Sequence, residues 1–174
     1  YRKAEDQCRE ALDITRKYFG EMSVRLARIY NVIGITLEKS GEYENAIEYY
    51  YKSLEIEVKV FGELHPGVGV LNANLGRCFK QFAGHKNVLS FYRAALNSYR
   101  TALGSEHFMV GKIYGDIARY HRENHQYDAA LNFAQKELEI LTKVFGAQHS
   151  AVALAHSDIG FSLHGNGDFE KALF

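Results

Sequence analysis

The chain has little of what breaks helices or cross-links a fold. Among 174 residues there is one proline, Pro66, and no tryptophan. Proline disrupts a helix interior because it lacks an N–H group and clashes with the preceding turn, so its scarcity favours long helices. The two cysteines, Cys8 and Cys78, are too few for a disulfide framework and are typical of a reducing compartment, so we expect a cytoplasmic protein.

Long apolar runs and an excess of charge of one sign are also missing. No run approaches the roughly 18 apolar residues that a membrane helix needs, so no membrane partner is expected. Lysine and arginine number 21, as do aspartate and glutamate, and the formal net charge is zero. This balance excludes a uniformly basic nucleic-acid binder and leaves RNA binding along a local patch as the weaker alternative.

The sequence does contain a repeat of 42 residues. A large apolar residue followed by glycine recurs at this spacing in Phe19-Gly20, Phe61-Gly62, Leu103-Gly104 and Phe145-Gly146. Small residues that follow isoleucine or leucine keep the same register at Gly34, Gly76, Ala118 and Gly160. One register kept through successive copies indicates a repeat architecture. The glycines that end each copy stand where a helix C-terminus favours a positive φ.

Each repeat has the pattern of two helices. In the first full repeat, apolar residues spaced by three or four form one stripe before the break at Ser40-Gly41 and a second stripe after it. The first stripe is Leu26, Ile29, Tyr30, Ile33 and Leu37, and the second is Tyr43, Ala46, Ile47, Tyr50, Leu54 and Val58. Glycine in the middle of the first helix costs roughly 1 kcal/mol, which predicts the close approach of a neighbouring helix there.

We therefore expect a single array over residues 1–174, with about eight full helices and a truncated ninth. Its parts are residues 1–18 as the second helix of a partial repeat, three full repeats at 19–60, 61–102 and 103–144, and a truncated repeat at 145–174. Phe169, Leu173 and Phe174 would form an apolar end without a polar cap. We expect a segment of a longer array, in which such an end could also support self-association.

The small residue of the first helix, Gly41-Glu42-Tyr43 at the turn and Ala46 early in the second helix resemble a tetratricopeptide repeat. The 42-residue length and the His65-Pro66 pair between repeats resemble the kinesin-light-chain type. This resemblance covers essentially the whole chain. It implies an all-α, right-handed superhelical solenoid of antiparallel helix pairs. It also implies a non-enzymatic scaffold or adaptor that binds proteins and needs no cofactor.

Three histidines recur at the repeat spacing and could suggest a metal site. They are His65, His107 and His149. Zinc ligands must converge within about 2.1 Å of one ion, whereas residues one repeat apart are separated by roughly one helix layer of 8–10 Å or more. We therefore expect a linker or capping role for these histidines. We expect no metal ligands, and no catalytic residues, because no acid–base pair or nucleophile stands out.

A binding face is predicted on the first helix of each repeat, which in the family lines the concave side of the array. Opposite the apolar stripe, this helix presents seven basic and two acidic residues over the three full repeats. Such a face favours an extended, acidic peptide. The candidate binding residues are Arg28, Asn31, Ile35, Asn74, Arg77, Lys80, Lys112, Arg119 and Arg122. The alternatives are a solvated basic face without a ligand, and a structural spacer in a larger protein.

Overall fold

The structure is a computed structural model that describes residues 2–82 and 87–172, with their side chains except those of residues 2–6, 8 and 9. Leu173 and Phe174 of the predicted apolar end, and the side chain of Cys8, lie outside the described residues. The chain folds as two compact units, Tyr1–Ser98 and Tyr99–Phe174. All regular secondary structure in the described ranges is helical, which confirms the predicted all-α fold class.

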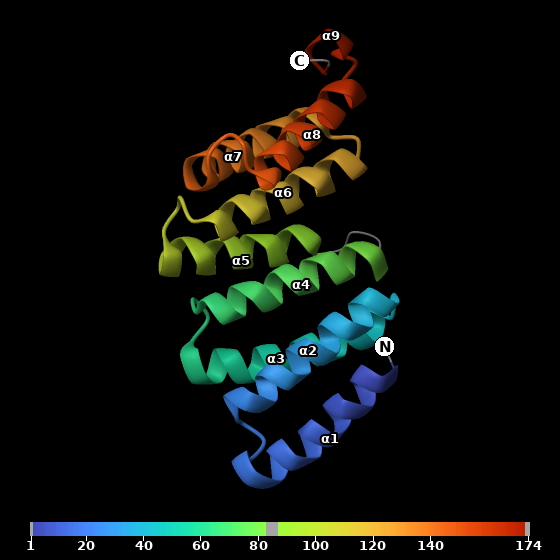
Figure 1. Ribbon diagram of the computed structural model, residues 1–174, viewed down its shortest axis with the longest axis vertical. Helices are drawn as coiled ribbons and strands as arrows, with labels where there is room; N and C mark the ends of the chain where they lie inside the picture. Colours follow the sequence, from blue (N-terminus) through green and yellow to red (C-terminus); the bar gives the residue numbers. More distant parts are fainter. Residues whose placement is uncertain (1, 83–86, 173–174) are drawn as a thin grey trace. The chain divides into compact units, whose positions relative to one another are not determined.

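The helices follow the predicted two-helix repeat. The first unit contains α1 (Arg2–Phe19), α2 (Val24–Ser40), α3 (Tyr43–Phe61), α4 (Pro66–Phe82) and most of α5 (Val88–Leu103). The second contains α6 (Phe108–Glu123), α7 (Tyr127–Phe145), α8 (Ser150–Gly165) and the short α9 (Phe169–Ala172). Figure 1 shows α1 to α4 packed in chain order, and α6 to α9 likewise. The first helices of the repeats are α2, α4, α6 and α8.

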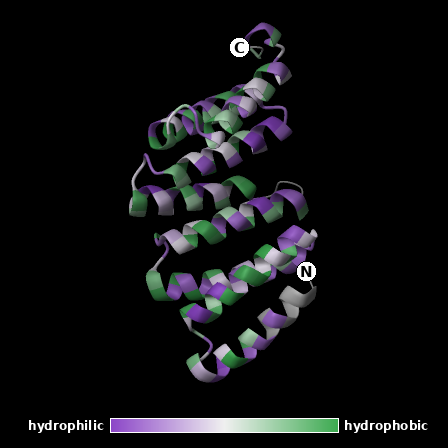
Figure 2. Cartoon of the chain, viewed as in Figure 1, coloured by the Kyte–Doolittle hydropathy of each residue, from purple (hydrophilic) through white to green (hydrophobic). Residues whose placement is uncertain are grey.

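Amphipathic helices build the core of each unit. Leu26, Ile33 and Tyr50 of the predicted stripes are buried, and Figure 2 shows apolar and polar residues interleaved around the helices. A helix such as α2 therefore buries one face against its neighbours and leaves the other to solvent. The repeat-end glycines, such as Gly62 and Gly146 with φ of 85° and 79°, have the positive φ that was predicted for them.

The predicted close approach is made by tyrosine rings at Gly34 and Gly76, whereas the nearest atom to a Cβ added at Gly160 is the backbone oxygen of Ala172 at 3.8 Å. In the first unit, a Cβ atom added to Gly34 would lie 2.6 Å from Cε1 of Tyr50. One added to Gly76 would lie 2.6 Å from Cε1 of Tyr92. Real Cβ atoms do not come this close to other heavy atoms. Glycine in α2 and α4 therefore makes room for a buried ring from the second helix of the same repeat.

The recurrent linker histidines cap helices, as predicted. The N–H groups of Gly67, Met109 and Ala151 donate to Nδ1 of the histidine two residues before, at 3.2, 3.2 and 3.1 Å. The histidines are His65, His107 and His149, which precede α4, α6 and α8. Each satisfies a backbone donor that has no partner within its helix. Each imidazole accepts through Nδ1, so the capping form is the neutral one.

Candidate binding face

Three predicted site residues of the first unit form a hydrogen-bonded row across α2 and α4. The Nδ2 amide of Asn74 donates to Oδ1 of Asn31 at 3.1 Å. The Nη2 group of Arg77 donates to Oδ1 of Asn74 at 2.7 Å. We call Asn31, Asn74 and Arg77 the amide–arginine row. Asn74 is 5% exposed, so within this row it positions its two neighbours rather than presenting its own amide to solvent.

Glu38 holds the far end of the row in place. Arg77 donates through Nε to Oε1 of Glu38 at 3.0 Å, and the hydroxyl of Tyr50 donates to Oε2 at 2.6 Å. Burial, with the hydrogen bond to the Glu38 carboxylate, raises the pKa of Tyr50, which therefore remains a donor. The guanidinium of Arg77 is thus oriented, and its side chain is still 39% exposed.

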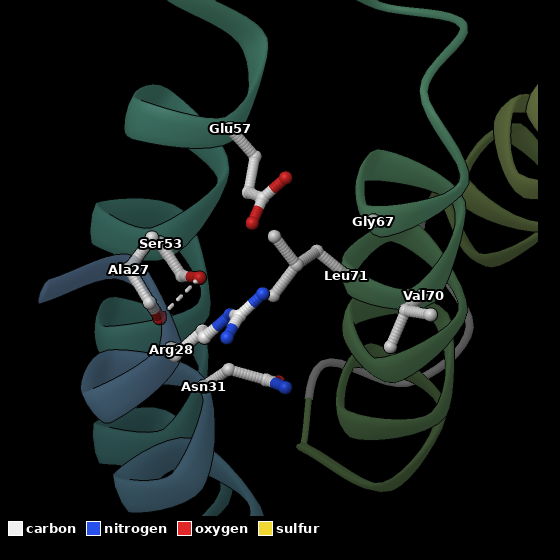
Figure 3. A pocket seen from close by; sticks show the side chains of 8 residues that line it. All are labelled: Ala27, Arg28, Asn31, Ser53, Glu57, Gly67, Val70 and Leu71. Carbon is white, nitrogen blue, oxygen red and sulfur yellow. Dashed lines mark hydrogen bonds between the residues drawn. The ribbon is translucent and has the colours of Figure 1, made fainter. Parts of the chain in front are cut away.

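A pocket of about 120 Å³ opens beside this row, between α2, α3 and α4 (Figure 3). It is lined by Ala27, Arg28, Asn31, Ser53, Glu57, Gly67, Val70 and Leu71. The predicted residues Arg28 and Asn31 reach into it from α2. Glu57 reaches in from α3 and is 9% exposed. Of the other predicted residues in this unit, Ile35 packs against the core and Lys80 is half-buried.

The basic residues of the second unit are bound to carboxylates. Arg119 donates through Nη1 to Oδ2 of Asp158 at 2.7 Å and through Nη2 to Oδ1 of Asp116 at 2.7 Å. Arg122 donates to Oδ1 of Asp158 at 2.6 Å, and its guanidinium lies 5.3 Å from the ring centre of Phe161. The structure therefore brings Arg119 and Arg122 together around one aspartate, whereas Lys112 on the same helix is exposed.

Glu137 of α7 is a further buried carboxylate in this unit. It is 6% exposed, and an added Cβ on Gly115 would collide with its carboxylate, so the glycine makes room for it. Burial raises its pKa to about 7, while Arg119 opposes the shift and Asp158 adds to it. We call Asp116, Arg119, Arg122, Glu137 and Asp158 the charged cluster.

These carboxylates correct the charge count made from the sequence. Asp116 and Asp158 bind predicted basic residues, and Glu57 lies in the pocket beside Arg28, yet none of the three was counted on the face. The positive excess is therefore smaller than seven bases against two acids. The sequence spacing could have indicated two of the arginine–carboxylate pairs. Arg77 and Glu38, like Arg119 and Asp158, are 39 residues apart, which is one repeat less about one helical turn.

The described residues include a buried thiol and no cluster of metal ligands. Cys78 is fully buried, and burial raises the pKa of its thiol to about 12, so it carries no accessible thiolate. Among residues 2–82 and 87–172, no three histidine, cysteine, aspartate or glutamate side chains gather as a metal site requires. No helix in the same ranges is long and apolar enough to span a bilayer.

Comparison with known families gives a match along most of the chain. The sequence profile described as tetratricopeptide repeat matches residues 1–56, 25–101 and 109–174. No curated protein sequence matches the chain.

Solved structures share the fold. The crystal structure of BtubC (BKLC) from P. vanneervenii is similar over 98% of this chain and 68% of its own, with a TM-score of 0.87 and 24% identity. A protein of Podosopora anserina designated a kinesin light chain, with nearly identical TPR-like repeats, is similar over 97% of this chain and 80% of its own. Its TM-score is 0.79 and its identity 15%. The predicted resemblance to the kinesin-light-chain type of repeat is thus confirmed.

Proposed function

Because the chain belongs to the tetratricopeptide repeat family, we propose that it binds an extended, acidic peptide segment of another protein on the first helices of its repeats. Tetratricopeptide repeats are generally protein–protein interaction modules and are typically non-enzymatic scaffolds. The proposed binding residues are those predicted from the sequence, with the buried Asn74 positioning Asn31 and Arg77: Arg28, Asn31, Ile35, Asn74, Arg77, Lys80, Lys112, Arg119 and Arg122.

The amide–arginine row is the observation that carries this proposal. An asparagine amide can donate to and accept from a peptide backbone, and an arginine fork suits a carboxylate. In the first unit both groups are held by hydrogen bonds from neighbouring helices, and the row lies beside a pocket. Binding therefore orders few additional side chains, which lowers its entropic cost.

A peptide selection tests the proposal. The purified chain is screened against a library of eight-residue peptides of varied net charge, and the bound peptides are sequenced. We expect enrichment of aspartate and glutamate, and affinities that fall about tenfold or more between roughly 50 and 300 mM salt, since exposed charge interactions are screened. Selected peptides without acidic residues, or affinities that do not change with salt, would contradict an acidic partner.

An apolar pocket of the second unit supports self-association as a second candidate. The pocket measures about 390 Å³ and is lined by Ser157, Gly160, Phe161, His164, Phe169 and Ala172. Phe161 and Phe169 are 63% and 58% exposed, and clustered apolar surface of this kind is typical of interaction sites. Light scattering over a range of concentrations tests it. The candidate predicts a dimer that Phe161→Ser weakens, and a monomer at every concentration would rule it out.

A further inference from the structure

The pocket of the first unit contains a carboxylate that lacks a hydrogen-bond donor. Glu57 is 9% exposed, and its Oε2 atom accepts no hydrogen bond from the described residues. Figure 3 shows the carboxylate turned from α3 into the space that faces α4. Burying a charged group without a partner is costly, so such groups are normally paired. The position of Glu57 therefore indicates a donor that comes from outside the chain.

His65 does not supply this donor while it caps α4. Its Nδ1 atom lies 3.3 Å from Oε2 of Glu57, but the same nitrogen accepts the N–H of Gly67 at 3.2 Å. Nδ1 therefore presents a lone pair to the carboxylate instead of a proton. Protonation would create an ion pair with Glu57 and would abolish the cap. A Cβ on Gly67 would lie 2.6 Å from Oε2, so glycine at this position leaves the carboxylate its space.

Arg28 gives the pocket a cation on its other side. Its side chain enters from α2, and within the described part of the chain its guanidinium makes no ion pair at 4.0 Å or less (Figure 3). The pocket thus has a positive group on the α2 side and a carboxylate on the α3 side. A ligand that neutralises both groups carries a cation and an anion next to each other.

The size and walls of the pocket favour lysine as the cation. The pocket of about 120 Å³ has room for the side chain, and a compact ammonium group suits the single unpartnered oxygen, Oε2 of Glu57, better than the planar fork of arginine, which binds both oxygens of a carboxylate. Ala27, Val70 and Leu71 line the pocket and would pack against the methylene stem. An ammonium group carries three donors, one of which can meet Oε2 of Glu57.

We propose that this pocket binds a lysine side chain of the peptide segment, whose ammonium group pairs with Glu57 while an adjacent acidic residue pairs with Arg28. The inference rests on the proposed peptide-binding function and makes it more specific. The partner segment is acidic overall but contains a lysine beside an aspartate or glutamate. Asn31 belongs both to the pocket lining and to the amide–arginine row, and it is placed to bind the peptide backbone where the two meet.

Fluorescence anisotropy with the full chain tests this assignment on three labelled eight-residue peptides that share an acidic background. The first has a central Lys-Glu pair, the second replaces its lysine by norleucine, and the third replaces the glutamate of the pair by glutamine. We expect each replacement to weaken binding about tenfold. Glu57→Gln should remove the preference for lysine over norleucine, and Arg28→Gln should remove the preference for glutamate over glutamine. Glu55→Gln, at an exposed site of α3 paired with Lys59, should alter neither preference.

The outcomes separate this inference from the proposed function. If the peptides bind and lysine and norleucine are equivalent on the unaltered chain, the lysine pocket is wrong and the peptide-binding face stands. If Arg28→Gln strengthens binding of the Lys-Glu peptide, Arg28 itself pairs with the carboxylate of Glu57 and competes with the peptide lysine, and the assignment is again wrong. If neither these peptides nor any library peptide binds, both proposals are overturned. The comparison of lysine with norleucine needs no variant, so a variant that fails to fold leaves the test intact.

Discussion

The glycine–tyrosine pairs of the first unit are replaced by alanines at the equivalent positions of the second. In the first, Gly34 and Gly76 each receive a tyrosine ring, whereas the equivalent positions of the third repeat hold Ala118 and Ala134, both buried. At other positions both units use glycine to make room for a side chain: Gly67 and Gly115 face the carboxylates of Glu57 and Glu137, and Gly165 faces the ring of Tyr127. One period of 42 residues can therefore bury either an aromatic ring or an ionisable group. The position of the missing Cβ atom decides which of the two is buried.

The difference also changes the state of the basic residues. Arg77 binds the carboxylate of Glu38, which also accepts a hydrogen bond from the hydroxyl of Tyr50. Arg119 and Arg122 instead share Asp158, and Arg119 also binds Asp116. The side chain of Arg77 is 39% exposed, against 35% for Arg119 and 25% for Arg122, so it offers more of its surface to a ligand. The first unit is therefore the better candidate for binding, and the charged cluster of the second has a larger role in its stability.

The largest expected effect comes from moving a tyrosine into the second unit. Ala134→Tyr places a ring against Ala118, where no glycine makes room, and should cost about 3 kcal/mol of unfolding free energy through overpacking. The double variant Ala118→Gly with Ala134→Tyr copies the pair of the first unit and should recover most of that loss. Chemical denaturation measures both. If the double variant is no more stable than Ala134→Tyr alone, the glycine does not serve as the receptor of the ring.

Removing the shared aspartate should cost more than removing its counterpart in the first unit. Asp158→Asn takes away the acceptor of two arginines and should destabilise the protein by about 2–3 kcal/mol, against about 1–2 kcal/mol for Glu38→Gln. Glu48→Gln, in the exposed pair with Lys52, should change the free energy of unfolding by less than about 0.5 kcal/mol. Equal losses of unfolding free energy for Asp158→Asn and Glu38→Gln would contradict a larger role of the charged cluster in stability.

Glu137 should make stability depend on pH. Its pKa is raised from 4.5 to about 7 in the folded protein, so between these values the folded state holds a proton that the unfolded state has lost. Its contribution to stability therefore falls as pH rises from about 4.5 to 7. Glu137→Gln should raise the free energy of unfolding by about 2 kcal/mol at pH 8 and change it little near pH 4.5. A gain of equal size at both pH values would contradict this titration.

The smallest effect expected is at the helix caps, which both units share. His107→Ala removes the acceptor of the Met109 N–H and should cost about 1 kcal/mol, whereas His107→Asn should retain most of the cap. Thermal unfolding would show a shift of about 2–4 °C for the alanine variant. If asparagine and alanine gave equal shifts, the loss would come from ring packing rather than from capping.

The helical repeat could be predicted because its signals are local. Apolar spacing, the glycines at repeat ends and the recurrent histidines each act within one or two helical turns. The structure accordingly places the helices, the positive φ of Gly62 and the cap by His65 where they were expected. Even the close approach at Gly34 was predicted, although the ring of Tyr50 as its occupant was not.

The charge state of the binding face could not be predicted from one helix at a time. Asp158 meets Arg119 and Arg122 across a repeat boundary, and Glu57 reaches the pocket from a second helix. Such contacts depend on how neighbouring helices are placed against one another. The predicted positive charge of the face was therefore too large, because carboxylates from neighbouring helices were not counted. By contrast, Asn31 and Asn74, which hydrogen-bond to each other, were both predicted as binding residues.

We propose that the amide–arginine row of the first unit holds an acidic peptide. The most direct measurement is an anisotropy titration of one acidic peptide from the library with Arg77→Gln and, as control, Lys59→Gln on the exposed face of α3. Both variants remove one positive charge. We expect an affinity loss of about tenfold or more for Arg77→Gln and less than about twofold for Lys59→Gln. Equal losses in the two variants would show that net charge, and not the row, attracts the peptide.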